Sequence, residues 1–200
     1  MVQKQFVLAT RNQNKVEEIR DILKEERWEL HSLRDFPETE ETVENGKTLL
    51  ENAMKKASAS FRWTRIPSLA DDTGLEVDRL KGAPGVRSNR FAGENASYRE
   101  NNEKLLRLLK GIPREERTAR FRCVVALVDG DGKWWVEGVC EGIILSEYRG
   151  ENGFGYDPVF YVPEMGRTFA EMQAGEKNTI SHRGKAFREM AQLIKRHSGA

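Results

Sequence analysis

The chain has 200 residues, of which 32% are charged and 38% are hydrophobic, and its formal net charge is +1. This length is enough for one substantial domain, and the balanced charge argues against a protein whose main task is to coat nucleic acid. No apolar stretch approaches the roughly 18 residues that a membrane helix needs, and the first residues lack the apolar region of a signal peptide. We therefore expect one cytoplasmic domain, residues 1–200, with neither nucleic acid nor a membrane as a partner.

The N-terminal part of the chain predicts a strand, a polar turn and a helix. The apolar run from Phe6 to Thr10 predicts a buried strand. Asn14 followed by Glu17 is typical of a helix cap, and apolar residues follow at helical spacing (Val16, Ile19, Ile22 and Leu23). This order would place a helix N-terminus over the end of a strand.

The next segment predicts a loop, a helix and an acidic turn. Residues 36–44 are acidic and contain a proline, which favours a loop. The pair Thr48 and Glu51 predicts a capped helix that runs to about Trp63. A short strand over residues 67–70 would then deliver Asp71 and Asp72 into a turn, with a further strand at 75–78.

The remaining elements alternate between helix and strand. Ser97 and Glu100 predict the cap of a third helix, with a buried side formed by Leu105, Leu106, Leu108 and Leu109. Two strands over 119–129 and 134–146 would be joined by the turn Asp129–Gly132. A glycine-rich loop, a strand at 159–162 and a last helix containing Phe187, Met190, Ala191 and Ile194 complete the chain. We expect an α/β fold with a mixed central sheet, flanked by helices, and two lobes around a substrate cleft.

Residues 10–15 are candidates for binding phosphate. A helix N-terminus offers unpaired backbone N–H groups and a partial positive charge. Polar and basic side chains accompany it here, namely Thr10, Arg11, Asn12, Gln13, Asn14 and Lys15. On its own, this segment favours an ordinary capped helix after a strand.

Glu44, Asp71 and Asp72 are candidates for a divalent cation site. Mg²⁺ takes carboxylate oxygens together with phosphate oxygens and water. One carboxylate can hold the metal while another orients or deprotonates a water molecule. Asp and Gly also favour turns, so the segment Asp71–Gly74 can be a turn without a metal.

Two later segments could recognise a base. The glycines on both sides of Phe154 allow close approach of a ligand, the ring can stack on a base, and Asp157 can accept from ring N–H groups. Alternatively, Phe154 simply anchors a glycine-rich loop. Lys177 and Arg183 are donors suited to a carbonyl or phosphate oxygen, and Lys56 and Arg90 could add phosphate donors.

Taken together, these segments resemble the inosine triphosphate pyrophosphatase family. The resemblance runs from Thr10 to Arg183, and the motifs that carry it are ATRNQNK, ENG before ENA, ADDTGL, APGVRSNRF, GFGYDP and SHR. One departure is Thr73, where the family usually has serine and where the hydroxyl is retained.

The resemblance implies a homodimeric enzyme that uses Mg²⁺ to hydrolyse ITP, dITP or XTP to the monophosphate and pyrophosphate. It implies that Glu44 and Asp72 bind the metal, that Asp72 accepts the proton, and that Lys56 lies near the phosphates. It further implies substrate contacts from Thr73, Phe154, Gly155, Tyr156, Asp157, Lys177, His182 and Arg183.

Several alternatives remain open at the level of the sequence. Asp71 is a second candidate for the base, because the sequence does not separate adjacent carboxylates. A Maf-like pyrophosphatase acting on modified pyrimidine nucleotides and a non-catalytic nucleotide-binding regulator are the other functions considered. An RNA-binding role is disfavoured by the balanced charge.

Overall fold

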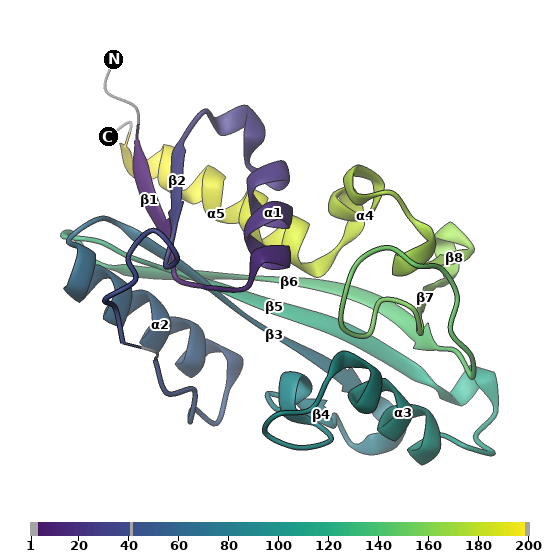
Figure 1. Ribbon diagram of the computed structural model, residues 1–200. Coiled ribbons are helices and arrows are strands. Elements are labelled where there is room, and N and C mark those ends of the chain that lie inside the picture. Colours follow the sequence, from purple (N-terminus) through teal and green to yellow (C-terminus); the bar gives the residue numbers. More distant parts are fainter. Residues whose placement is uncertain (1–3, 41, 199–200) are drawn as a thin grey trace. The chain divides into compact units, whose positions relative to one another are not determined.

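The computed structural model describes residues 4–40 and 42–198 (Figure 1). Residues 1–3, on which the signal-peptide expectation partly depends, lie outside the described residues. Among those that are described, no helix is long and apolar enough to cross a membrane. The helices and strands in chain order are β1 (Gln5–Leu8), α1 (Gln13–Ile22), β2 (Glu29–Ser32), α2 (Leu49–Thr64), β3 (Ser68–Val77), β4 (Pro84–Gly85), α3 (Tyr98–Leu108), β5 (Thr118–Val128), β6 (Lys133–Ile144), β7 (Phe160–Val162), β8 (Arg167–Thr168), α4 (Ala174–Ile180) and α5 (His182–Ser198).

The strands form one mixed sheet in the order β2-β1-β3-β5-β6-β7-β8, with β4 paired to β3. β1 is parallel to both β2 and β3, with Leu8 opposite Ser32 on one side and Leu69 on the other. The pairs β3–β4, β6–β7 and β7–β8 are antiparallel. The predicted α/β fold with a mixed central sheet and flanking helices is therefore confirmed.

The chain divides into two compact units. The first unit contains the described residues within 1–72, 123–138 and 182–200, and the second contains residues 73–122 and 139–181. The unit boundary falls inside β3, directly after Asp72.

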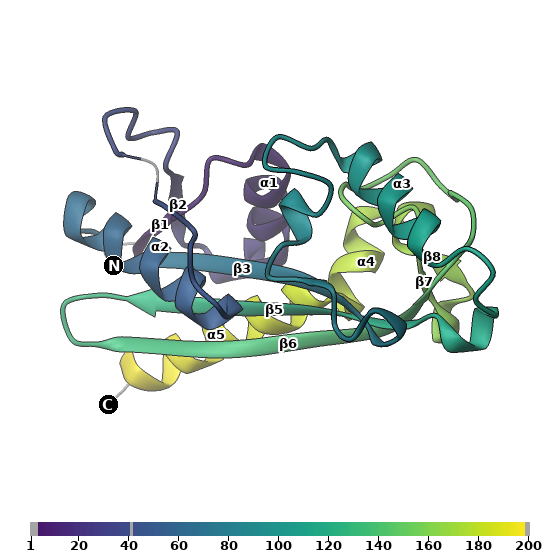
Figure 2. The same ribbon diagram turned by 90° about the horizontal axis from the view of Figure 1, so that it is seen from below.

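In the first unit, helices cover both faces of the strands. α1 and α5 pack on each other on one face, and α2 lies on the opposite face (Figures 1 and 2). Every second residue of β5 enters the core beneath α1 and α5, as the alternation of a strand requires. The core on this face includes Val16, Ile19, Leu69, Cys123, Val125, Leu127, Phe187 and Met190.

Gly138 on β6 allows the start of α5 to approach the sheet closely. A Cβ atom at this position would lie 2.1 Å from the carbonyl oxygen of His182 and 2.6 Å from the backbone nitrogen of Ala186. The first turn of α5 therefore rests directly on the backbone of β6. Arg183 lies in this turn, so its position depends on the missing side chain of Gly138.

The core of the second unit is built around three phenylalanines and α3. The ring of Phe160 lies with its centroid 4.6 Å from that of Phe121 and 5.0 Å from that of Phe169. The predicted capping box of α3 is present, because Ser97 and Glu100 bond each other's backbone N–H groups. Leu105 and Leu109 are buried as predicted.

The prediction that Leu108 lies on the buried side of α3 is wrong. The side chain of Leu108 is 48% exposed. Leu105 and Leu109 are about one helical turn apart and share the buried face, whereas Leu108 points away from that face. The presence of four leucines in this segment did not by itself show which of them face the core.

Two predictions about local structure near the candidate site are also wrong. α1 begins at Gln13 and is capped by Asn12, whose Oδ1 accepts from the backbone nitrogen of Lys15, rather than by Asn14. The segment Asp71–Gly74 is not a turn but the middle of β3. Strand pairing with β1 before this segment and with β4 after it overrides the turn preference of Asp and Gly. The short helix α4 had no signal in the sequence analysis.

The close approach at Gly138 yields a stability prediction. Gly138→Ala should lower the free energy of unfolding by about 1–3 kcal/mol, because the methyl group forces α5 away from β6. Gly130→Ala is the matched control, since a Cβ atom at Gly130 meets nothing within 4 Å. Urea unfolding of both variants measures the difference, and equal stabilities would contradict the close packing of α5 on β6.

Candidate active site

Two adjacent buried carboxylates, Asp71 and Asp72, lie in the middle of β3. Their exposed fractions are only 4% and 5%. Successive side chains of a strand point to opposite faces of the sheet. Accordingly, Asp71 is bonded from α1 and α5, while Asp72 is bonded from α2.

Asp71 is held by two cations. Its Oδ2 accepts from Lys15 Nζ at 3.0 Å and from Arg183 Nη2 at 3.1 Å and Nε at 3.3 Å. Burial opposes ionisation of this group, but Lys15 and Arg183 outweigh it and hold the pKa of Asp71 well below its usual range. The Asp71 carboxylate thus favours its charged form and neutralises the buried cations Lys15 and Arg183.

Arg183 completes this network with a third element. Its Nη1 donates to Glu18 Oε2 on α1 at 2.6 Å, and its side chain is 2% exposed. Burial disfavours the charged guanidinium, but Glu18 and Asp71 outweigh that effect and the pKa of Arg183 lies above its ordinary value. Helices α1 and α5 and strand β3 are therefore joined by one buried ion network.

Asp72 has a different environment on the opposite face of the sheet. Its Oδ1 accepts from Lys56 Nζ at 3.1 Å and its Oδ2 accepts from Asn52 Nδ2 at 3.2 Å. Burial raises the pKa of Asp72 above its ordinary value, Lys56 and Lys15 oppose the shift, and Glu44 reinforces it. This carboxylate is therefore less strongly committed to its charged form than Asp71.

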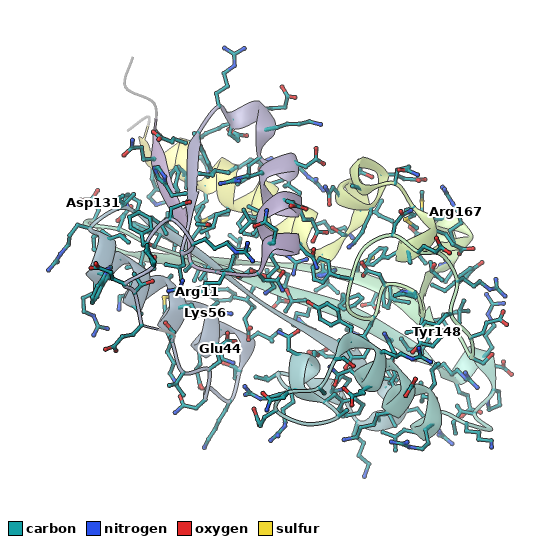
Figure 3. All side chains as sticks on the ribbon, viewed as in Figure 1. Arg11, Glu44, Lys56, Asp131, Tyr148 and Arg167 are labelled. Carbon is teal, nitrogen blue, oxygen red and sulfur yellow. The ribbon has the colours of Figure 1, made fainter. Side chains whose placement is uncertain are left out.

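Glu44 is brought to Asp72 by the loop before α2. Figure 3 labels Glu44 and Lys56, and Lys56 Nζ lies 3.3 Å from Glu44 Oε2. The same ammonium group lies 3.1 Å from Asp72 Oδ1, so it joins both carboxylates. Asn52 accepts from the backbone nitrogen of Gly46 at 2.8 Å while it donates to Asp72, which ties the loop to the strand. Burial opposes the charge of Lys56, but Asp72 and Glu44 outweigh it and raise the pKa of Lys56.

The donor set around Lys56 fits a magnesium ion that is completed by substrate. No group of three or more His, Cys, Asp or Glu side chains within residues 4–40 and 42–198 could hold a metal by itself. Mg²⁺ is commonly bound through one or two carboxylates, with water and substrate phosphates supplying the other oxygens. Glu44 and Asp72 meet that requirement.

The start of α1 is held in a compact, polar turn. Thr10 Oγ1 accepts from the backbone nitrogen of Asn12 at 3.2 Å, and Asn12 caps the helix. Arg11 donates through Nη2 to the carbonyl oxygen and the hydroxyl of Thr39, at 2.7 and 2.8 Å. Arg11 thus ties this turn to the acidic loop that leads to Glu44.

The second unit contains a fixed aromatic and charged cluster. Asp157 Oδ2 accepts from Lys177 Nζ at 2.7 Å and from the backbone nitrogen of Phe154 at 2.9 Å. The Lys177 ammonium lies 5.2 Å from the ring centroid of Phe154 and 5.4 Å from that of Phe169. Both charged side chains are almost fully buried, with exposed fractions of 7% and 4%.

Comparison with known proteins identifies the family. The sequence profile of the Ham1 family matches residues 6–193. The chain belongs to the Ham1 family.

Relatives and solved structures agree with this assignment. A dITP/XTP pyrophosphatase of Desulforamulus reducens is 52% identical over 192 residues, covering 96% of each chain. A dITP/XTP pyrophosphatase of Geobacter sulfurreducens is 51% identical and covers 97% of this chain and 96% of its own. A HAM1 protein from Coxiella burnetii matches with a TM-score of 0.87 at 40% identity, covering 97% of this chain and 100% of its own. The resemblance stated from the motifs is therefore confirmed.

Within this Ham1 family member, the predicted site residues fall into two groups. The first unit contains the segment from Thr10 to Lys15 with Glu44, Lys56, Asp72, His182 and Arg183. The second contains Thr73, Arg90, Phe154, Gly155, Tyr156, Asp157 and Lys177. Of these, Asn14 is exposed, whereas His182 is 2% exposed and Tyr156 donates its hydroxyl to the carbonyl of Ser88 at 2.9 Å. Their contacts with substrate stay predictions.

Three residues that contact predicted site residues were not among those predictions: Glu18, Asn52 and Asn102. Asn52 carried a usable signal, because it lies four residues before Lys56 on a predicted helix and so shares its face. Glu18 and Asn102 carried none, since their partners Arg183 and Gly155 are distant in the chain.

Two glycines of the Phe154 loop give a matched pair of variants. Gly153 and Gly155 both have positive φ, at +74° and +66°, so alanine is strained at either position. Only at Gly153 would a Cβ atom collide with Asp157 Oδ2, at 2.1 Å, whereas at Gly155 it meets nothing within 4 Å. Gly153→Ala should therefore disrupt the pair of Asp157 and Lys177, while Gly155→Ala should show the backbone strain alone.

The measurement is thermal unfolding together with nucleotide hydrolysis. Gly155→Ala should cost about 1–2 kcal/mol of stability, the ordinary penalty of a left-handed alanine. Gly153→Ala should cost more and should also weaken discrimination between purine bases. Identical behaviour of the two variants would contradict the structural role of Asp157 Oδ2.

Proposed function

We propose that this chain hydrolyses the non-standard purine nucleoside triphosphates ITP, dITP and XTP to the monophosphate and pyrophosphate, and so removes them from the nucleotide pool. The observation that carries the proposal is the cluster of Asp72 and Lys56, which are buried, with the partly exposed Glu44, a carboxylate pair around one cation. Relatives about half identical over nearly the full chain are named dITP/XTP pyrophosphatases, which supports the same conclusion.

The triphosphate is assigned to positive groups and to a helix N-terminus. The backbone N–H groups at the start of α1 and the side chains of Thr10 to Lys15 suit phosphate oxygens, and Lys56 and Arg90 add positive charge. Mg²⁺ held by Glu44 and Asp72 would supply charge neutralisation on the phosphates. Arg11 contributes by holding the loop that carries Glu44.

Asp72 is assigned as the proton acceptor. A water oxygen attacks the α-phosphorus, the bond from that phosphorus to the bridging oxygen breaks, pyrophosphate leaves, and the proton of the water passes to Asp72. Asp71 is unsuited to this role, because Lys15 and Arg183 both bind its Oδ2 and hold the pKa of this carboxyl well below its usual range. The geometry thereby favours one of two carboxylates that the sequence could not separate.

The base is assigned to the second unit, with further contacts from His182 and Arg183. Phe154 can stack on the purine, and Asp157 with Lys177 offers an acceptor beside a donor. Inosine and xanthine present an N1–H donor beside a 6-keto acceptor, whereas adenine reverses both groups. Mispairing of buried polar groups can reduce turnover by about 10⁴-fold or more.

The assembly and setting are part of the same proposal. We propose that residues 1–200 act as one pyrophosphatase domain, as a homodimer, in the cytoplasm, with Mg²⁺ as the cofactor. Sedimentation at micromolar concentration tests the dimer, and loss of turnover in excess EDTA with recovery in Mg²⁺ tests the metal.

The substrate assignment is tested by a panel of ITP, XTP, dITP, GTP, ATP and modified pyrimidine triphosphates, with pyrophosphate and orthophosphate quantified separately. Rapid release of pyrophosphate from ITP, dITP and XTP is expected, with little from ATP and GTP. Orthophosphate as the primary product would overturn the cleavage position. Preference for a pyrimidine would replace the proposed function with a Maf-like one, and binding without turnover would replace it with a regulatory one.

The two aspartates should differ when each is replaced by asparagine. Asp72→Asn should lower kcat by about 10²–10⁴-fold, the usual contribution of a general base. Asp71→Asn should instead lower the free energy of unfolding by about 3–5 kcal/mol, because Lys15 and Arg183 lose a buried counter-charge. Kinetics and urea unfolding of both variants distinguish the roles, and near-normal turnover in Asp72→Asn would sink the assignment.

A further inference from the structure

Helix α3 carries two neighbouring asparagines that are both buried, Asn101 and Asn102, each only 2% exposed. Asparagine is seldom buried without a hydrogen-bonding reason. Asn101 donates to the carbonyl of Asn89 at 3.1 Å and accepts from the backbone nitrogen of Ala92 at 2.7 Å. Asn102 donates to the carbonyl of Gly155 at 2.8 Å. Each side chain therefore holds a different loop of the second unit.

The two asparagines differ in how completely they are bonded. Both ends of the Asn101 amide are engaged. The Oδ1 atom of Asn102 is buried and has no hydrogen-bond partner among the described residues. A buried acceptor without a partner is unfavourable, and a leucine of similar size would fill the same space without that penalty. The hydrogen bond to Gly155 is thus the interaction that Asn102 makes and that leucine could not.

The same face of α3 also contacts the aromatic ring of this loop. Tyr98 lies four residues before Asn102, so both side chains point from one side of the helix. The ring centroids of Tyr98 and Phe154 are 6.0 Å apart. In Figures 1 and 2 the loop that contains Phe154 passes beside α3. α3 therefore supports the loop both at the Gly155 backbone and at the Phe154 ring.

We propose that Asn102 is a positioning residue that sets purine selectivity, by holding the Gly155 carbonyl and with it the neighbouring Phe154 ring and the pair of Asp157 and Lys177. The inference rests on the proposed function. The residues of this loop are assigned to the base, whereas the carboxylates assigned to the chemistry belong to the first unit. Loosening the loop should therefore change discrimination between bases more than the chemical step.

The test compares Asn102→Leu with the matched variant Asn101→Leu. For Asn102→Leu, the ratio of kcat/KM for ITP to that for ATP should fall about 3- to 10-fold, as for loss of one net hydrogen bond. The change should come mainly from the KM for ITP, with kcat within about twofold of the unsubstituted chain. The melting temperature should change little, because removal of the unpaired acceptor offsets the loss of the hydrogen bond to the Gly155 carbonyl.

Asn101→Leu should behave in the opposite way. Its melting temperature should fall, because the Asn89 carbonyl and the Ala92 nitrogen both lose their partner. The ratio of ITP to ATP turnover should be unchanged. An equal loss of selectivity in both variants would show that the whole helix is responsible and would overturn the role of Asn102.

Amide hydrogen exchange separates this inference from the proposed function. Exchange at residues 154–157 should increase in Asn102→Leu and stay unchanged in Asn101→Leu, whatever nucleotide is cleaved. Unchanged exchange and an unchanged ratio in Asn102→Leu would make Asn102 a packing residue only. The substrate panel on the unsubstituted chain tests the proposed function independently, because it does not depend on Asn102.

Discussion

The burial of two adjacent aspartates in a central strand is the constraint on which the first unit depends. Removing an ion from water costs several kcal/mol unless the protein supplies opposite charge and hydrogen bonds. The alternation of β3 sends Asp71 and Asp72 to opposite faces, so compensation must come from both layers of helices. α1 and α5 supply Lys15 and Arg183 on one side, and α2 supplies Asn52 and Lys56 on the other. The positions of three helices against β3 are thereby fixed by electrostatics as well as by apolar packing.

The charges of Asp71 and Asp72 are neutralised to different extents. This difference distinguishes a structural carboxylate from the one that is proposed to act in the reaction. Asp71 has two cations bound to one oxygen, and Arg183 is itself balanced by Glu18. Asp72 shares a single lysine with Glu44, which leaves a net negative cluster suited to a divalent cation. The same strand thus carries one carboxylate, Asp71, that is neutralised by two cations, and a second, Asp72, to which we assign the proposed chemistry.

Features that depend on neighbouring residues could be predicted from the sequence. The Thr48 cap of α2, the capping box of α3 and the turn between β5 and β6 have local causes, and each was placed correctly. The full capping box predicted for α2 was wrong, because Glu51 accepts from the backbone nitrogen of Lys47 rather than from that of Thr48. The family was also recognised from the sequence, because the types and spacing of the motif residues resemble it, whereas the roles of those residues stay predictions. The turn predicted at Asp71–Gly74 was wrong because pairing with β1 and β4 decides the backbone there.

Residues whose role is created by tertiary contact could not be found in this way. Glu18 is an ordinary helical glutamate until Arg183, 165 residues later, reaches it. Asn102 is an ordinary polar position on α3 until the loop at Gly155 folds against it. In both cases the partner comes from a remote segment, and no periodicity or composition of the local sequence reports it.

In the second unit, the buried side chains of Asp157 and Lys177 neutralise each other as an ion pair. This pair also constrains the proposed recognition of the base. Asp157 Oδ2 is shared between the Phe154 backbone and Lys177, so the ring, the carboxylate and the ammonium form one rigid group. In the proposed recognition of the base, an acceptor and a donor held in this way would match the N1–H and 6-keto groups of inosine. The proposed selectivity would then depend on how this group is supported, and the support comes from a glycine that leaves room for the carboxylate and from α3, which holds the loop.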